Sequence, residues 1–220
     1  MSVSDYLTKA KEVQEALLNL FEDEENAEIN FENLFSKLDN YNIKNDKKEF
    51  KIFLSLLSTI SDNHYRKYDF FKKIEEILQN MQEVIKKYFT NSEIFDIFKD
   101  NKRIILFLVE SGIILNDDSF MEQVMVQNKF YPNYFNYFYQ NMMDDAPDNF
   151  KENQKIGENE SYLCSLIRQD SVEDFISHVN RKNISLKSKI KPSVFETNTF
   201  FNSKMPSLIE YAAFFGSIQI

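Results

Sequence analysis

The residues that could carry catalysis or bind a metal lie far apart in this sequence. The two histidines are His64 and His178, and the single cysteine is Cys164. Zinc sites and nucleophilic centres need such side chains close together, often one helical turn apart. Neither histidine has a cysteine or carboxylate at such a spacing that stands out in so acidic a chain. Cys164 sits among apolar residues, so we expect it to pack as a small hydrophobic side chain rather than to act as a nucleophile.

Phosphate binding and acid–base catalysis also lack a recognisable motif. The three glycines, Gly112, Gly157 and Gly216, are too widely separated to form a glycine-rich phosphate loop. The acidic pairs Asp117–Asp118 and Asp144–Asp145 are neighbours in sequence, and such neighbours do not face one substrate from a helix. The sequence therefore predicts that the protein is not an enzyme and has no cofactor, no metal and no small-molecule substrate.

Composition favours helices and disfavours nucleic acid as a partner. The chain has 220 residues, 43% of them hydrophobic, with only 3 glycines and 4 prolines, too few for a fold rich in tight turns. The net charge is −9, and basic against acidic residues number 7 to 12 over 1–60 and 10 to 15 over 61–150. Phosphate backbones are bound mainly by Lys and Arg. We expect no nucleic-acid binding.

The sequence predicts a cytoplasmic protein that does not enter a membrane. Its start lacks an apolar segment of signal-peptide length, and no run approaches the roughly 18 apolar residues of a membrane span. With one cysteine, no intrachain disulfide can form, which is typical of a reducing compartment.

The first ninety residues show the periodicity of amphipathic helices. Residues 4–24 carry an apolar stripe, Asn30 can cap a second helix, Asp46 with Glu49 can cap a third, and Asp69 can open a longer helix that reaches Tyr88. Short connections between helices imply antiparallel neighbours. The side chains expected in the core are Tyr6, Ala10, Val13, Leu17, Leu20, Phe21, Phe31, Leu34, Phe35, Leu38, Phe50, Phe53, Leu54, Leu57, Ile60, Ile74, Ile77, Leu78, Met81, Ile85 and Tyr88.

Further helices are expected between residues 94 and 139. Residues 94–100 and 101–112 form a short and a longer helix, and Ser119, with Glu122 as its capping partner, can start another. An aromatic segment follows at 130–139. It could be a stacking or peptide-anchoring surface, but Phe and Tyr are abundant throughout the chain, which favours a place in the core. The acidic, proline-containing stretch 144–148 predicts a boundary between domains 1–145 and 146–220.

Two stretches in the second domain share one pattern at an offset of 46 residues. Ser161 corresponds to Ser207, and Asp170 corresponds to Gly216. In the later copy, Ser207 and Glu210 form a capping box, and Gly216 can take the left-handed backbone that ends a helix. The residues expected to pack in the earlier copy are Tyr162, Leu163, Leu166, Val172, Phe175, Ile176 and Val179.

This later copy resembles the first helix of an ankyrin repeat. Ser207 stands where that family has Thr, Ile209 where it has Leu, and Gly216 at the turn glycine. Ala212 and Ala213 match the alanine pair, and Ile218 and Ile220 the first apolar positions of the second helix. Leu208 replaces the family's Pro and Glu210 its His, so the usual Thr–His hydrogen bond cannot form, and we expect the capping box to replace it.

The whole chain resembles protist ankyrin-repeat proteins in which a divergent helical region precedes the repeats. The resemblance implies an all-α fold of antiparallel helical hairpins, in which 1–145 caps the start of an ankyrin solenoid at 146–220. It also implies a non-enzymatic scaffold for protein–protein interaction, with an unknown protein as partner. We expect the last repeat to be cut off at Ile220. The side chains expected to face its missing second helix in part are Leu208, Ile209, Tyr211, Phe214, Ile218 and Ile220.

The segment 184–204 explains why the offset exceeds the usual ankyrin period of about 33 residues. It is locally basic, and loops of this length often carry function. The alternative function is therefore an adaptor or inhibitor that docks a separate enzyme through 184–204; a merely solvated loop is the simpler interpretation. The candidate partner-binding residues are Lys189, Lys191, Glu196, Asn198, Asn202 and Lys204.

Overall fold

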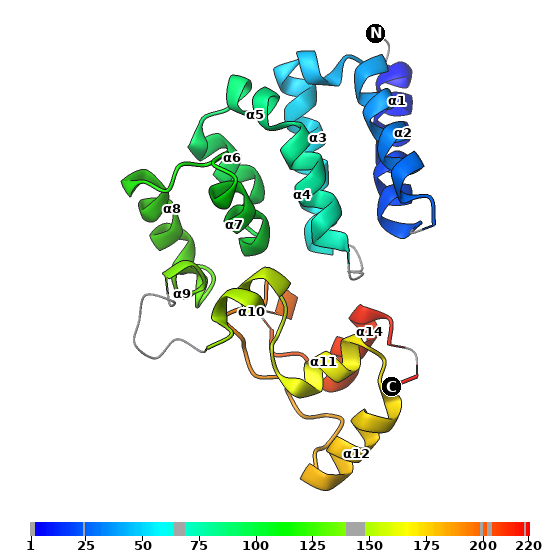
Figure 1. The fold of residues 1–220 in the computed structure, drawn as a ribbon, viewed down its shortest axis with the longest axis vertical. Helices are drawn as coiled ribbons and strands as arrows, with labels where there is room; N and C mark the ends of the chain where they lie inside the picture. Colours follow the sequence, from blue (N-terminus) through cyan, green and yellow to red (C-terminus); the bar gives the residue numbers. More distant parts are fainter. Residues whose placement is uncertain are drawn as a thin grey trace. The chain divides into compact units, whose positions relative to one another are not determined.

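The computed structural model describes residues 3–23, 25–63, 69–139, 148–198, 200–201, 204–217 and 219–220, with side chains from residue 7. These residues form an all-α protein (Figure 1) without a β-strand, apart from an isolated antiparallel bridge between Lys189 and Ser207. The helices are α1 (Val3–Glu22), α2 (Ala27–Asn40), the 3-10 helix η1 (Ile43–Asn45), α3 (Lys47–Asn63), α4 (Phe70–Asn80), α5 (Gln82–Tyr88), α6 (Asn91–Phe98), α7 (Lys102–Glu110), α8 (Asp118–Asn128), α9 (Tyr134–Tyr139), α10 (Phe150–Ile156), α11 (Tyr162–Arg168), α12 (Val172–Lys182) and α14 (Leu208–Phe215).

The chain divides into two compact units. The first comprises residues 1–61 with 67–98, and the second comprises 62–66 with 99–220. The boundary predicted between residues 145 and 146 falls within 140–147, outside the described residues, and stays a prediction.

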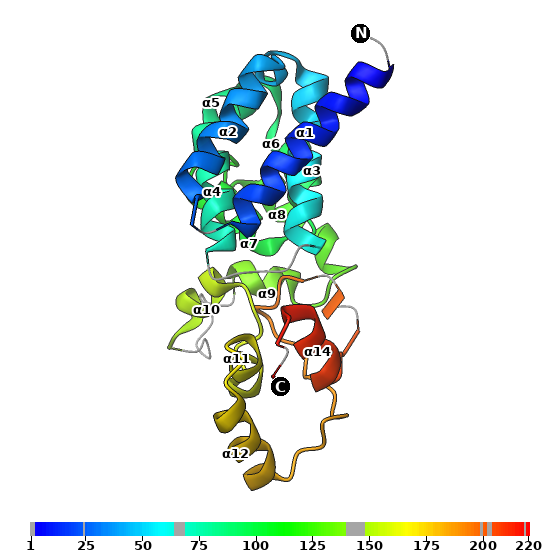
Figure 2. The same ribbon diagram turned by 90° about the vertical axis from the view of Figure 1, so that its right-hand side faces the viewer.

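The first unit is built on the amphipathic stripes read from the sequence. In α1 the side chains of Val13, Leu17, Leu20 and Phe21 are buried, as predicted. Ala10 was expected among them but is exposed. Helices α1 and α2 pack side by side, as Figures 1 and 2 both show.

Local hydrogen bonds decide where α2 and α3 begin. Asp46 caps α3 as predicted, because its Oδ1 accepts from the backbone N–H of Lys48 at 2.8 Å and of Glu49 at 3.1 Å. The predicted cap of α2 at Asn30 is wrong, since the N-cap is Asn26, four residues earlier. The Asp23 carboxylate accepts from the backbone N–H of Asn26 at 3.1 Å and shapes the turn there.

The single long helix predicted from Asp69 to Tyr88 is in fact two helices, α4 and α5. They meet at Met81, which is fully buried and whose N–H donates at 3.2 Å to the carbonyls of both Ile77 and Leu78. No Gly or Pro marks the break, and Ile85 is buried as the helical period requires. Because the apolar period continues through Met81, periodicity alone could not reveal the break between α4 and α5.

In the second unit, α7 follows its predicted pattern and α8 does not. The Asn101 side chain accepts from the Ile104 N–H at 3.4 Å, and Gly112 has a φ of 68° just after the helix. The predicted cap of α8 at Ser119 is wrong. Asp117 takes that place, and its Oδ1 accepts from the Phe120 N–H at 3.0 Å.

The aromatic segment contributes to the core of the second unit, as the favoured interpretation predicted. Tyr134 and Tyr137 of α9 are buried, whereas Phe130, which precedes the helix, is exposed. The Tyr137 hydroxyl donates to the Gln154 carbonyl at 2.6 Å, and the Gln154 side-chain amide donates to the Tyr137 carbonyl at 2.7 Å. This reciprocal pair joins α9 to α10.

The two copies of the offset pattern have the same caps. The side chains of Ser161 and Ser207 accept from N–H groups three residues ahead, at 3.4 and 3.2 Å. Asp170 and Gly216 end the helices in left-handed backbone, with φ of 49° and 66°. The complete capping box of Ser207 and Glu210 is present as predicted.

Helix α11 contacts both α12 and α14 around a small hydrophobic core. Tyr162 and Ile176 were predicted to pack there but are exposed. Leu208 and Tyr211, which were expected to face an absent helix in part, are instead buried. The core consists of Cys164, Leu166, Ile167, Phe175, Ile190, Phe201, Leu208, Tyr211, Ala212 and Phe215.

Candidate functional site

An open apolar groove of about 260 Å³ runs along α14 in the second unit. Two large side chains at its wall are exposed, Ile209 by 56% and Leu186 by 45%. No charged side chain takes part in the lining. The groove is lined by Phe175, Leu186, Leu208, Ile209, Ala212, Ala213, Gly216, Ser217 and Ile220.

Beyond Leu208 and Ile209, the α14 side of this groove consists of small residues. Ala212 is buried against the core, while Ala213 and Gly216 are exposed. With side chains this small, another helix can approach the α14 backbone closely, because interaxial distances depend on the side chains at the contact. Close packing at Ala212 was predicted from the sequence, but the exposure of Ala213 was not.

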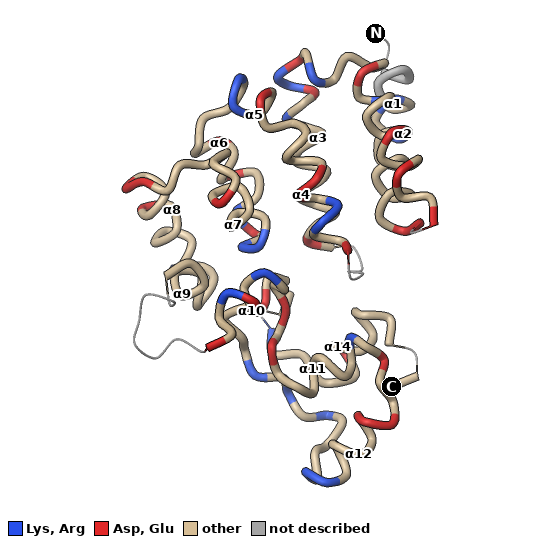
Figure 3. Tube along the Cα trace, in the orientation of Figure 1, with Lys and Arg blue, Asp and Glu red and all other residues tan. Residues whose placement is uncertain are grey.

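The wall opposite α14 belongs to a positively charged stretch of an otherwise acidic protein. Residues 175–195, which include the groove residues Phe175 and Leu186, contain five Lys and Arg residues and no Asp or Glu. The blue segments that follow α12 in Figure 3 mark this stretch. One of them, Lys189, forms an exposed ion pair with Glu210 at 3.4 Å.

The middle of segment 184–204 is not a solvated loop. Residues 193–198, which we call the strap, are almost entirely buried. The Thr197 N–H and hydroxyl donate to the Gly157 carbonyl at 3.1 and 2.8 Å. Gly157 has a φ of 71°, and a Cβ there would lie 3.3 Å from Thr197 and Arg103. Both the backbone conformation and these contacts favour glycine at this crossing.

The predicted partner-binding residues are separated by this burial. Glu196 and Asn198 are each only 2% exposed, so the prediction that they face a partner is wrong. Their side chains bind backbone instead: Glu196 accepts from the Asn198 N–H and Asn198 from the Phe200 N–H, both at 2.9 Å. Lys189, Lys191 and Lys204 are exposed, and Asn202 lies outside the described residues.

Two neighbouring buried basic residues were missed from the sequence, and the first of them holds the strap. The Lys102 ammonium donates to the Val194 carbonyl at 2.8 Å and lies 4.9 Å from the centre of the Tyr137 ring. Burial lowers the pKa of Lys102 to about 7, partly offset by the charge of Glu196. The next residue, Arg103, donates from Nε to the Lys155 carbonyl at 2.6 Å. The one sequence signal was their position directly before the apolar run at 104–109.

A half-buried arginine, Arg168, supports the core beside the groove. Arg168 donates to the Asn159 carbonyl at 2.8 Å and to the Tyr211 hydroxyl at 2.7 Å. Cys164 is buried beside them, and burial raises its thiol pKa to about 11. A thiol of such high pKa stays protonated at neutral pH, which disfavours a nucleophilic role.

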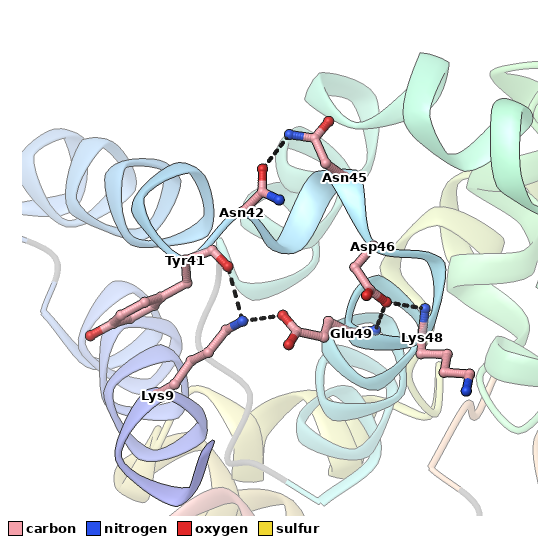
Figure 4. Close-up of polar contacts among 7 residues, drawn as sticks. All are labelled: Lys9, Tyr41, Asn42, Asn45, Asp46, Lys48 and Glu49. Atoms are coloured by element: carbon pink, nitrogen blue, oxygen red, sulfur yellow. Dashed lines mark hydrogen bonds and ion pairs between the residues drawn. The ribbon is translucent and has the colours of Figure 1, made fainter. Parts of the chain in front are cut away.

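The first unit has a polar junction where α1, α2 and α3 meet (Figure 4). The Lys9 ammonium donates to the Tyr41 carbonyl at 2.9 Å and forms an ion pair with Glu49. Beside it, the Tyr41 hydroxyl donates to Glu12 at 2.5 Å, which lowers the pKa of that carboxyl. Each group contacts another helix or turn of this unit, so the junction has a structural role.

The described residues offer no alternative site of recognised chemistry. None of their His, Cys, Asp and Glu side chains gather in groups of three that could hold a metal ion. His178 packs its ring 5.1 Å from that of Tyr162, and His64 lies outside the described residues, as do Asp144 and Asp145. Among the helices described, none combines the length and hydropathy that a membrane span requires.

Comparisons with protein families, with curated proteins and with solved structures gave no match. The class that the structure itself defines is an all-α protein. The ankyrin resemblance stays a prediction that rests on the residues quoted above.

Proposed function

We propose that this chain is a non-enzymatic protein-interaction scaffold that binds a protein partner in the α14 groove. The observation that carries the proposal is the groove itself: an uncharged apolar surface with Ile209 and Leu186 about half exposed. Exposed apolar surface of this kind is characteristic of protein interaction sites. In this proposal the protein is cytoplasmic, and the region 1–145 acts as the cap of an ankyrin-type solenoid.

The alternative function is docking of an enzyme through segment 184–204. Fewer residues of this segment are accessible to a partner than the sequence suggested. The strap packs inside the second unit. The exposed basic residues of the segment are Lys187, Lys189, Lys191 and Lys204. Lys187 and Lys189 flank α14 near its start, where the Leu208 N–H donates to the Ser188 carbonyl at 3.3 Å. An adaptor of this kind would therefore use the groove's basic edge.

A photo-crosslinking amino acid placed at Ile209 tests the proposal. The matched control is Leu115, an exposed aliphatic side chain of the same unit that does not line the groove. We expect one protein to crosslink from position 209 and not from 115, and the same protein, once purified, to bind the chain directly. Ala213→Arg fills the groove from an exposed position and should abolish that binding. Equal crosslinking from both positions, or unchanged affinity in the variant, would contradict the proposal.

A further inference from the structure

In the earlier copy of the offset pattern, α12 follows α11 and contacts it. After α11, Asp170 turns the chain, the Ser171 N–H donates to the Leu166 carbonyl at 3.0 Å, and α12 begins. After α14 the same bond recurs, from the Ser217 N–H to the Ala212 carbonyl at 3.0 Å. In this later copy, Ala213 is exposed.

The shape of the groove suits a helix better than an extended peptide. Its α14 side presents the apolar Ile209 followed by the small residues Ala212, Ala213 and Gly216, a row at helical spacing. An added strand needs a free sheet edge. The short backbone pairing beside the groove is already occupied, because the Ile190 N–H donates to the Pro206 carbonyl at 2.8 Å. A helix needs only an apolar trough that takes its i, i+3, i+4 and i+7 side chains.

The basic residues near the groove favour a partner helix of opposite charge. Leu186 of the groove wall is followed directly by the exposed Lys187, and the exposed Arg181 and Lys182 end α12. Residues 175–195 contain no Asp or Glu; the nearby Glu210 of α14 pairs with Lys189. An occupant with carboxylates along one flank would gain attractive contacts there, whereas a basic flank would be repelled.

We propose that the groove binds an amphipathic α-helix of a partner protein that carries acidic residues along one flank. The proposal rests on the proposed function and adds the chemistry of the partner. The apolar face of the partner helix packs on Ala212 and Ala213, and its acidic flank lies along Lys182 and Lys187. The apolar contact supplies affinity, and the charge supplies selectivity and a faster association rate.

Three labelled synthetic peptides test this against the full chain by fluorescence anisotropy. They share one apolar helical face and differ in carrying an acidic flank, a basic flank, or the acidic composition in scrambled order. With about three exposed ion pairs at stake, the acidic peptide should bind about fivefold more tightly than the basic one at low salt. That preference should fade as salt shortens the Debye length below about 5 Å. The bound acidic peptide should become helical by circular dichroism.

Variants separate the apolar contribution from the electrostatic one. Ala213→Arg should weaken both unscrambled peptides. The double variant Lys182→Glu/Lys187→Glu should reverse the preference between them, while Lys151→Glu/Lys155→Glu, with the same charge change at exposed positions of α10, should leave it unchanged.

Each contrary result has a distinct meaning. Equal binding of the acidic and basic peptides would overturn the charge selection, and equal binding of the scrambled peptide would overturn helix docking. In both cases a partner crosslinked from position 209 would still support the scaffold. Dimers in sedimentation that Ala213→Arg dissociates would make a second copy the occupant. Binding to phosphatidylglycerol vesicles without binding to any peptide would make an anionic lipid surface the ligand. Either of these two results would overturn the proposal.

Discussion

Replacing Lys102 by Met should remove a pH dependence of stability that a buried lysine imposes on the second unit. Lys102 is 3% exposed, and its pKa of about 7 compares with an ordinary value of 10.5. The folded protein therefore holds this amine neutral over a pH range in which the unfolded chain is still protonated. Since the unfolded state binds more protons there, stability rises with pH from below 7 toward 10.5, and is lost as pH falls through 7.

The magnitude follows from the two pKa values. One pH unit corresponds to about 1.4 kcal/mol wherever the unfolded lysine binds a proton that the folded one does not. Between pH 6 and 9, the difference in bound protons between the unfolded and the folded state adds up to the equivalent of about two pH units. Lys102 should therefore add about 3 kcal/mol to the free energy of unfolding over this interval. Cys164, whose pKa is raised to about 11, acts in the opposite sense only above about pH 9.

The assay is urea unfolding of wild type and Lys102→Met at several pH values between 6 and 9. The two proteins are compared where the free energy of unfolding has the same dependence on urea concentration. The difference in stability between the two proteins should change by about 3 kcal/mol, in favour of wild type at the higher pH. Lys151→Met, at an exposed position, is the control and should follow wild type. Parallel curves for wild type and Lys102→Met would refute the argument. Titration of the Lys102 side chain by NMR gives an independent value of its pKa.

Four further substitutions test the local interactions. Ser207→Ala removes the α14 cap and should cost about 1 kcal/mol, seen as faster amide exchange in α14; unchanged exchange would count against the capping box. The Ser207 backbone N–H lowers the pKa of Glu210, so acidification through that pKa should loosen α14 in wild type and much less in Glu210→Gln, and equal loosening would contradict this. Gly216→Ala forces a side chain to a φ of 66° and should cost about 1–2 kcal/mol by urea unfolding, whereas wild-type stability would refute the strain. Lys9→Met should lower the melting temperature more than Lys11→Met, whose side chain is 75% exposed, and equal effects would show that the Lys9 junction contributes little.

Helix ends and core faces could be predicted where their causes are local. The capping box at Ser207 and the Asp46 cap depend on residues three apart, and the stripes of α1 and α3 follow from the helical period. The starts of α2 and α8 were misplaced, and in both cases the cause is also local. Near Asn30, a carboxylate seven residues earlier sets the turn, and near Ser119, the competing cap Asp117 is only two residues away.

The burial of the strap could not be predicted because its partners are remote in sequence. The basic residues of 184–204 indicated a solvated segment. In the structure, however, the Val194 carbonyl accepts a hydrogen bond from Lys102, and the Thr197 hydroxyl donates one to the Gly157 carbonyl. Nothing near Glu196 or Asn198 indicates that both side chains bind neighbouring backbone groups and leave the surface. The position of Lys102 before the apolar run 104–109 was a weak signal that did not identify Val194 as its partner.

The groove could be predicted in part. The alanine pair and Gly216 indicated close packing along α14, and the basic character of 187–191 was read directly from the sequence. The sequence did not show that Leu186 would form the opposite wall. That requires the reversal of the chain after α12, where Asn183 takes a left-handed conformation with a φ of 51°.

The most direct test of the account is methyl NMR of the chain bound to the acidic peptide or to the partner crosslinked from position 209. The account predicts intermolecular contacts from the methyl groups of Ala212, Ala213 and Ile209 to the apolar side chains of a bound helix. Contacts from Leu115 instead, or none from α14 at saturating ligand, would contradict it.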